Sequence, residues 1–212
     1  MNFGKSQLNW FDLLVMGLVV LGIFRGRKRG LSEELLDVVQ WIVIVVVGAI
    51  AYKPVAQALS NATRLPGFYS NVTSYVVIAL GIKLLFSFIK RAAGEKLVQS
   101  DAFGPFEYYL GMIAGVVRFS CILLFALSFL HARYISDSER AETARMQADN
   151  FGSISFPTFG SLQHTIFYES ISGQFIRKNL RAQLVQPAKG GLGLGGETLG
   201  RRRQNAVEEI LK

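Results

Sequence analysis

The sequence predicts an all-α membrane protein with four transmembrane helices and a C-terminal tail that is partly helical and partly disordered. Half of the 212 residues are hydrophobic and only 18% are charged, whereas soluble domains usually carry about a quarter charged residues. The long apolar runs lie in residues 1–130, and ordinary polar chain follows them. One membrane domain with a tail therefore fits this pattern better than two soluble domains.

Two apolar runs near the N-terminus are separated by a short basic stretch. A spanning helix needs about 20 apolar residues, within a range of roughly 17 to 25, so we predict spans at 8–24 and 35–52. Trp10 suits the headgroup boundary at the start of the first span, and Pro54 is expected to end the second. The predicted turn between the two spans consists of Arg25, Gly26, Arg27, Lys28, Arg29 and Gly30.

Two further apolar runs predict spans at 72–89 and 108–130, which complete a transmembrane domain over residues 8–130. The connecting loops are predicted at 53–71 and 90–105. Each loop contains a turn signal that combines proline and glycine.

The distribution of lysine and arginine predicts the orientation of the spans. The turn at 25–30 has four such residues and the loop at 90–105 has three, whereas the loop at 53–71 has two. Cytoplasmic loops carry the excess of positive charge. We therefore expect the turn at 25–30 and the loop at 90–105 inside, and both termini outside, in the periplasm.

The tail divides into a helical part at 131–189 and a Gly-rich linker with a basic end at 190–212. Residues 136–149 are polar on all sides and predict a short exposed helix. Residues 159–181 place apolar side chains on two faces at helical pitch. A surface helix usually has one apolar stripe, so two stripes predict packing on two sides, against the membrane domain and a second copy of the chain.

The composition argues against several classes of function. The net charge of +8 lies mainly between apolar runs and near the C-terminus, which indicates contact with the lipid bilayer rather than with nucleic acid. Cys121 is the sole cysteine, and neither histidine has neighbours at zinc spacing. We expect no enzymatic activity, no catalytic residue, no metal and no cofactor.

Four ionisable residues fall inside or beside the predicted spans, at Asp12, Lys83, Glu107 and Arg118. Such residues usually face a bundle interior or a wet cavity. They have two interpretations: a polar pathway for an ion, proton or small solute, or ion pairs between helices. Lys83 and Glu107 lie at similar predicted depth and are the expected pair, whereas different depths disfavour a pair between Asp12 and Arg118.

A small-xxx-small motif, formed by Gly111 and Gly115, lies inside the fourth predicted span. Glycines at this spacing let two helix backbones approach closely. The partner helix belongs either to the same chain or to a second copy.

Three stretches resemble the CvpA family of bacterial inner-membrane proteins, which is named for colicin V production. They are Trp10-Phe11-Asp12, the stretch from Arg25 to Leu36 that resembles the family's R-G-x-x-R-G-h-x-x-E-h-h turn and includes Glu34, and the stretch from Glu107 to Arg118. The last departs from the family pattern, because Glu107 replaces Asp, Tyr108 replaces Arg and Phe119 replaces Gly.

This resemblance covers about residues 8–130. It implies four membrane helices, an inner-membrane location, and a role in toxin production or export or in envelope homeostasis. It supplies no catalytic residue. Other membrane proteins or a second copy are the expected partners, and a small channel or transporter that uses the intramembrane charges is the alternative function.

Overall fold

Helices make up every regular element that the structure describes. The computed structural model describes residues 8–63, 67–97, 104–133, 135, 137–151 and 156–187. Within these ranges the all-α prediction is confirmed. The elements are α1 (Trp10–Thr63), α2 (Gly67–Leu97), η1 (Gly104–Phe106), α3 (Glu107–His131), α4 (Asp137–Phe151), α5 (Phe159–His164), η2 (Thr165–Glu169), α6 (Ile171–Asn179) and η3 (Arg181–Gln183).

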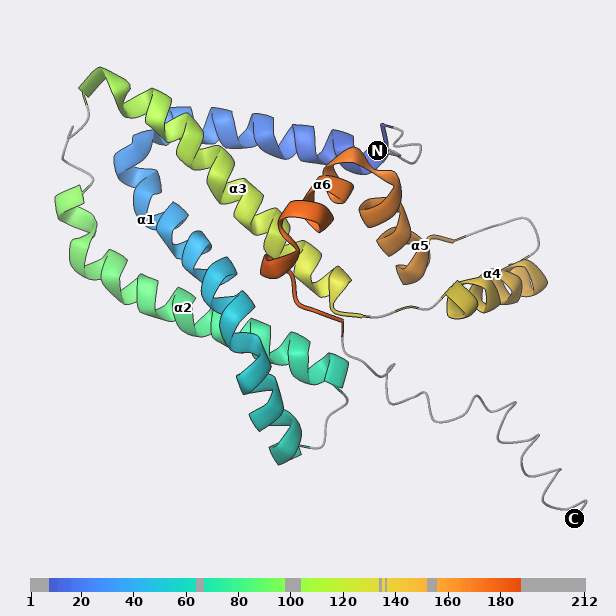
Figure 1. Ribbon diagram of the computed structural model, residues 1–212. Helices are drawn as coiled ribbons and strands as arrows, with labels where there is room; N and C mark the ends of the chain where they lie inside the picture. The colour runs from blue at the N-terminus through green and yellow to red at the C-terminus, as the bar shows by residue number, and fades with distance from the viewer. Residues whose placement is uncertain are drawn as a thin grey trace, which may run out of the picture.

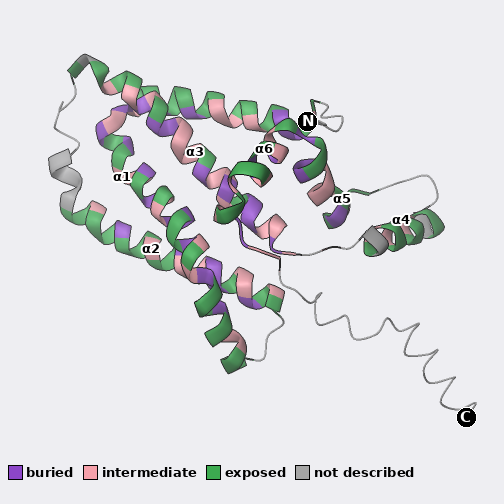
Figure 2. Ribbon diagram, viewed as in Figure 1, coloured by how far each residue is buried: buried purple, intermediate pink, exposed green. Residues whose placement is uncertain are grey.

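Three helices in the described part of the chain, α1, α2 and α3, are long and apolar enough to cross a membrane. Large apolar side chains are exposed on all three, among them Leu21, Leu84 and Ile113 at 57%, 63% and 63%. Figure 2 shows exposed stretches along each of these helices. A water-soluble protein rarely exposes contiguous apolar surface on this scale. The chain is therefore a multi-pass membrane protein.

A sharp kink at Gly30 divides α1 into a first arm, residues 10–29, and a second arm, residues 31–63. Gly30 has φ 77° and ψ 171°, a backbone conformation that glycine adopts without a Cβ clash. The predicted six-residue turn at 25–30 is wrong in extent, because the backbone stays helical up to Arg29. Long basic side chains can reach a polar region from a helix, so the charges did not require the backbone to unwind.

The helix α3 lies between the two arms (Figure 1). It runs antiparallel to the first arm, since Gly22 adjoins Gly115 whereas Gly30 adjoins Glu107. It runs parallel to the second arm, where Trp41 packs edge-on against Phe125. The helix α2 lies along the other side of the second arm, where the ring of Tyr75 closely contacts Gly48.

Two predicted loops are shorter than expected. Pro54 lies inside α1, which continues to Thr63, and α2 begins at Gly67. Both predicted bounds of the loop at 53–71 are therefore wrong. Neighbouring contacts can satisfy the backbone groups that a proline frees in a membrane helix. The predicted loop at 90–105 is also shorter, because α2 extends to Leu97.

The part of the tail from α5 to η3 is folded against the membrane helices. The short helix predicted at 136–149 is confirmed as α4, but residues 159–181 form α5, the π-helical η2 and α6, with a break at Ser170. The predicted linker at 190–212 lies outside the described residues. One apolar cluster joins tail and membrane helices through Phe11, Val45, Cys121, Leu124, Leu127, Ile166, Phe167, Ile176 and Leu184.

Candidate functional site

A buried ion pair lies close to the kink in α1. Glu34 is fully buried one helical turn after Gly30, and its Oε2 accepts a hydrogen bond of 2.7 Å from Nη1 of Arg118. The arginine side chain is 16% exposed. A charge-assisted bond of this length is among the stronger interactions available to a protein.

The pair extends into a wider polar network centred on Asp37. Nη1 of Arg118 lies 2.9 Å from Oδ2 of Asp37, and Nη1 of Arg29 lies 3.5 Å from the same oxygen. Lys90 donates to Asp37 and, at 2.9 Å, to Oε1 of Gln40. We call Arg29, Glu34, Asp37, Gln40, Lys90 and Arg118 the kink network.

The kink network joins four helical segments. Arg29 comes from the first arm, the two carboxylates from the second arm, Lys90 from α2 and Arg118 from α3. Removing one charge of a buried pair leaves its partner uncompensated at a high cost in free energy. The stability of the place where the four segments meet should therefore depend on keeping all of these charges together.

Some hydrogen-bonding capacity in the kink network is unused. Among the described residues, Oε1 of Glu34 and Nε of Arg118 are buried and have no hydrogen-bond partner. Oε1 of Glu34 does lie 3.7 Å from Nη1 of Arg29, as an ion pair. Buried polar groups in proteins are usually hydrogen-bonded, sometimes to ordered water.

Glycines bring the first arm and α3 into backbone contact beside the kink network. A Cβ on Gly22 would lie 3.0 Å from the backbone of Gly115, and one on Gly26 would overlap the carbonyl of Gly111. The structure thus places the small-xxx-small motif against a glycine row in the same chain. The predicted turn residue Gly26 acts here as a packing position.

Glu107 does not pair with Lys83. Its Oε1 accepts a 2.8 Å hydrogen bond from the backbone N–H of Ser32, directly after the kink. The side chain of Lys83 is exposed on α2, and no ion pair joins it to Glu107 in the described part of the chain. The predicted pair is wrong because similar depth does not make two helix faces meet.

Asp12 lies in a separate polar contact at the other end of the first arm. It is 4% exposed. Its Oδ1 accepts from the N–H of Ser172 at 2.8 Å, and its Oδ2 accepts from Ile171 at 3.3 Å. These donors are the first two residues of α6, where a helix has unsatisfied N–H groups and favours a negative charge. Asp12 therefore holds the tail helix.

The remaining basic residues of the predicted turn, Arg25, Arg27 and Lys28, are exposed. Three members of the kink network were not predicted as site residues from the sequence, namely Asp37, Gln40 and Lys90. The available signal was the recurrence of polar residues at every third position, 34, 37 and 40, within an apolar helix. That spacing keeps neighbouring side chains on adjoining faces.

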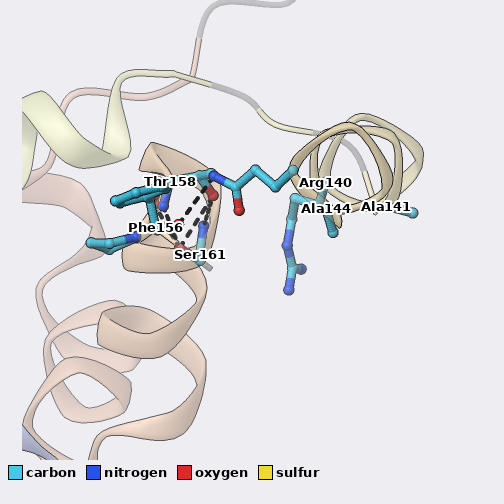
Figure 3. A pocket seen from close by; sticks show the side chains of 8 residues that line it. Arg140, Ala141, Ala144, Phe156, Thr158 and Ser161 are labelled. Atoms are coloured by element: carbon cyan, nitrogen blue, oxygen red, sulfur yellow. Dashed lines mark hydrogen bonds between the residues drawn. The ribbon is translucent and has the colours of Figure 1, made fainter. Parts of the chain in front are cut away.

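A hollow of about 710 Å³ lies between α4 and the start of α5 (Figure 3). Thr158 and Ser161 on its wall hydrogen-bond to each other as the capping box of α5. In the part of the chain that the structure describes, no group of three or more His, Cys, Asp or Glu side chains could hold a metal ion. The kink network is therefore the better candidate site.

The chain was compared with known protein families, curated proteins and solved structures. Residues 11–151 match the family model described as Colicin V production protein. No curated protein and no solved structure matches the chain. The matched segment contains the kink network and both glycine rows.

Proposed function

Because the chain belongs to the colicin V production family, we propose that it is a bacterial inner-membrane protein that supports toxin production or export, or envelope homeostasis. The proposed mechanism is non-enzymatic, through association with other membrane proteins or with a second copy. The family description supports the link to colicin V production.

The kink network is the observation that carries this proposal. Its two carboxylates face three cations from three other helical segments. Charges that compensate one another in this way fix helix positions and leave no activated nucleophile. The network therefore fits a scaffold whose shape presents surfaces to partners.

We further propose that the chain crosses the membrane four times, with each arm of α1 crossing once. The first arm rises about 30 Å at 1.5 Å per residue, and this length includes a basic last turn whose long side chains can reach the headgroups, so the arm is long enough to cross a bilayer. The exposed Arg25, Arg27 and Lys28 favour a cytoplasmic position for the kink. Both ends of the described chain would then face the periplasm.

A protease test in right-side-out spheroplasts checks this orientation. A periplasmic tail is cleaved in intact spheroplasts, whereas the kink region is cleaved only after lysis. A tail that stays protected until lysis contradicts the proposed orientation.

Colicin V release from a producing strain tests the function. We expect deletion of the gene for this chain to lower the released toxin and the native gene to restore it. Arg118→Leu should fail to restore release although the protein still reaches the membrane. Arg145→Leu, on the exposed face of α4, is the matched control and should restore release fully. Unchanged release on deletion would refute a role in toxin production.

The second candidate is a small channel or transporter. The buried atoms of Glu34 and Arg118 without hydrogen-bond partners favour it, because water or a passing solute could satisfy them. Ion flux into proteoliposomes that disappears with Arg118→Leu would support this function. Flux no greater than in empty liposomes would exclude it.

A further inference from the structure

The outer face of α6 combines apolar and basic side chains. Ile171 and Phe175 are 50% and 62% exposed, and Lys178 is exposed one turn further on. These residues are spaced i, i+4 and i+7, so they share one side of the helix. The opposite side is buried in the core through Gly173 and Ile176.

The depth of α6 relative to the membrane helices is fixed by Asp12. This carboxylate binds the N–H groups of Ile171 and Ser172, and it lies two residues after Trp10. Two helical residues correspond to about 3 Å along the axis. The start of α6 is therefore level with the start of the first arm, where the exposed Trp10 suits the headgroup region.

The end of α3 fixes the tail at the same level. His131 donates through Nδ1 to the carbonyl of Val185 at 2.8 Å. Gln163 donates through Nε2 to the carbonyl of Leu130 at 3.1 Å. The tail is thus held at the boundary by helices on both sides, and it lies beside the N-terminal end of α1 in Figure 1.

We propose that the outer face of α6, formed by Ile171, Phe175 and Lys178, lies in the headgroup region of the bilayer and binds anionic lipid. An amphipathic helix with apolar residues on one face and basic residues at its edge is suited to this position. The first arm, to which α6 is bound through Asp12, also exposes an apolar side chain near its start at Leu13.

Charge complementarity selects anionic lipid as the occupant. Lys178 and Arg181 are exposed at the C-terminal end of α6 and just beyond it, and a basic residue near an anionic membrane surface gains favourable electrostatic energy. The guanidinium of Arg177 lies 4.1 Å from the centre of the Tyr168 ring. The proposal requires only that the chain is a membrane protein, and it is independent of any role in toxin production.

Fluorescence quenching in the full-length protein tests the position of this face. The native cysteine is replaced by Cys121→Ala, and Phe175→Cys carries an environment-sensitive label in vesicles that contain phosphatidylglycerol. We expect quenching by nitroxide on the lipid headgroup region and little quenching by aqueous iodide. The matched water-exposed control is the same label on Ala148→Cys in α4. This label should be quenched by aqueous iodide and only weakly by the lipid nitroxide.

Two results would overturn the proposal. Quenching by iodide alone places the face of α6 in water. Protection from both quenchers means that protein, such as a second copy, covers it. Ile171→Cys provides an independent labelling position if the first variant does not fold, and it should give the same quenching pattern.

The contribution of charge is tested by adding Lys178→Gln to the labelled variant. The ratio of lipid to iodide quenching should fall by up to about fivefold, the effect of one lysine near an anionic surface. The fall should disappear in vesicles of phosphatidylcholine alone. Arg145→Gln on α4 is the control for net charge, and an equal effect of this variant would contradict specific binding by α6.

Discussion

The two ends of the first arm of α1 are held in place by different kinds of interaction. At Gly30 the arm meets α3 through backbone contact between glycines, and a network of opposite charges surrounds the kink. At Asp12 the arm meets the tail through a single capping carboxylate and an apolar cluster. The kink end combines backbone contact with ion pairs between residues far apart in the sequence. The Asp12 end combines hydrogen bonds to a helix terminus with apolar packing.

This difference indicates unequal tolerance to change. A buried charge without its partner is costly, and two backbones in contact leave no room for a side chain. A lost cap weakens one helix terminus by a smaller amount. The kink end should therefore govern global stability, and the tail end should govern local docking.

The largest effect is expected from Glu34→Leu. It removes the fully buried carboxylate and leaves Arg118 with Asp37 as its remaining acidic partner among the described residues, so the free energy of unfolding should fall by about 3 to 4 kcal/mol. Unfolding in mixed micelles, followed by circular dichroism, measures the loss. Adding Arg118→Leu to the first variant should recover part of the loss, because the buried arginine charge, which then has one acidic partner fewer, is gone while Arg29 and Lys90 still face Asp37.

The neighbouring Glu33→Leu provides the control for Glu34→Leu. Glu33 is exposed on the same helical turn, and a change there should stay within about 0.5 kcal/mol. Equal losses for both variants would show that the network does not dominate at the kink.

Gly26→Leu should have the next largest effect. The new side chain would overlap the backbone of Gly111 and push the first arm of α1 away from α3. The free energy of unfolding should fall by about 3 kcal/mol. The same unfolding measurement applies. Gly17→Leu on the same arm meets nothing within 4 Å and should unfold like the native protein.

Asp12→Ala should act locally at the tail end. The variant loses the hydrogen bonds from Ile171 and Ser172 to Asp12 but keeps the N-cap residue Ser170. The loss should cost about 1 to 2 kcal/mol and raise hydrogen exchange of α6 amides, measured by mass spectrometry, without raising it around Glu34. Asp12→Asn keeps an acceptor oxygen and should retain most of the protection. Faster exchange at both ends would contradict the separation of the two regions.

The smallest effect is expected from Lys83→Gln. The side chain is exposed on α2 and makes no ion pair in the described residues, so unfolding should change by no more than about 0.5 kcal/mol. A loss comparable to that of Glu34→Leu would instead assign Lys83 an important partner.

Much of the candidate site could be anticipated from local patterns. Arg118 stands out as a charge in an apolar helix, Glu34 belongs to the turn that resembles the family pattern, and the spacing of Gly111 and Gly115 indicates close packing. The choice of partners could not be anticipated. Similar predicted depth in the membrane suggested Lys83 as the partner of Glu107. In the structure, the packing of α3 against α1 instead brings Glu107 to the backbone N–H of Ser32.

The sequence alone determined the all-helical class, the apolar segments and the family, because hydropathy and motif spacing are local properties of the chain. Only the tertiary structure decided that one residue, Gly30, makes the bend, that Arg118 meets Glu34, and that the tail packs beside Asp12. These features depend on contacts between residues 84 and 160 positions apart. Such contacts follow from how whole helix faces fit together, which no local pattern encodes.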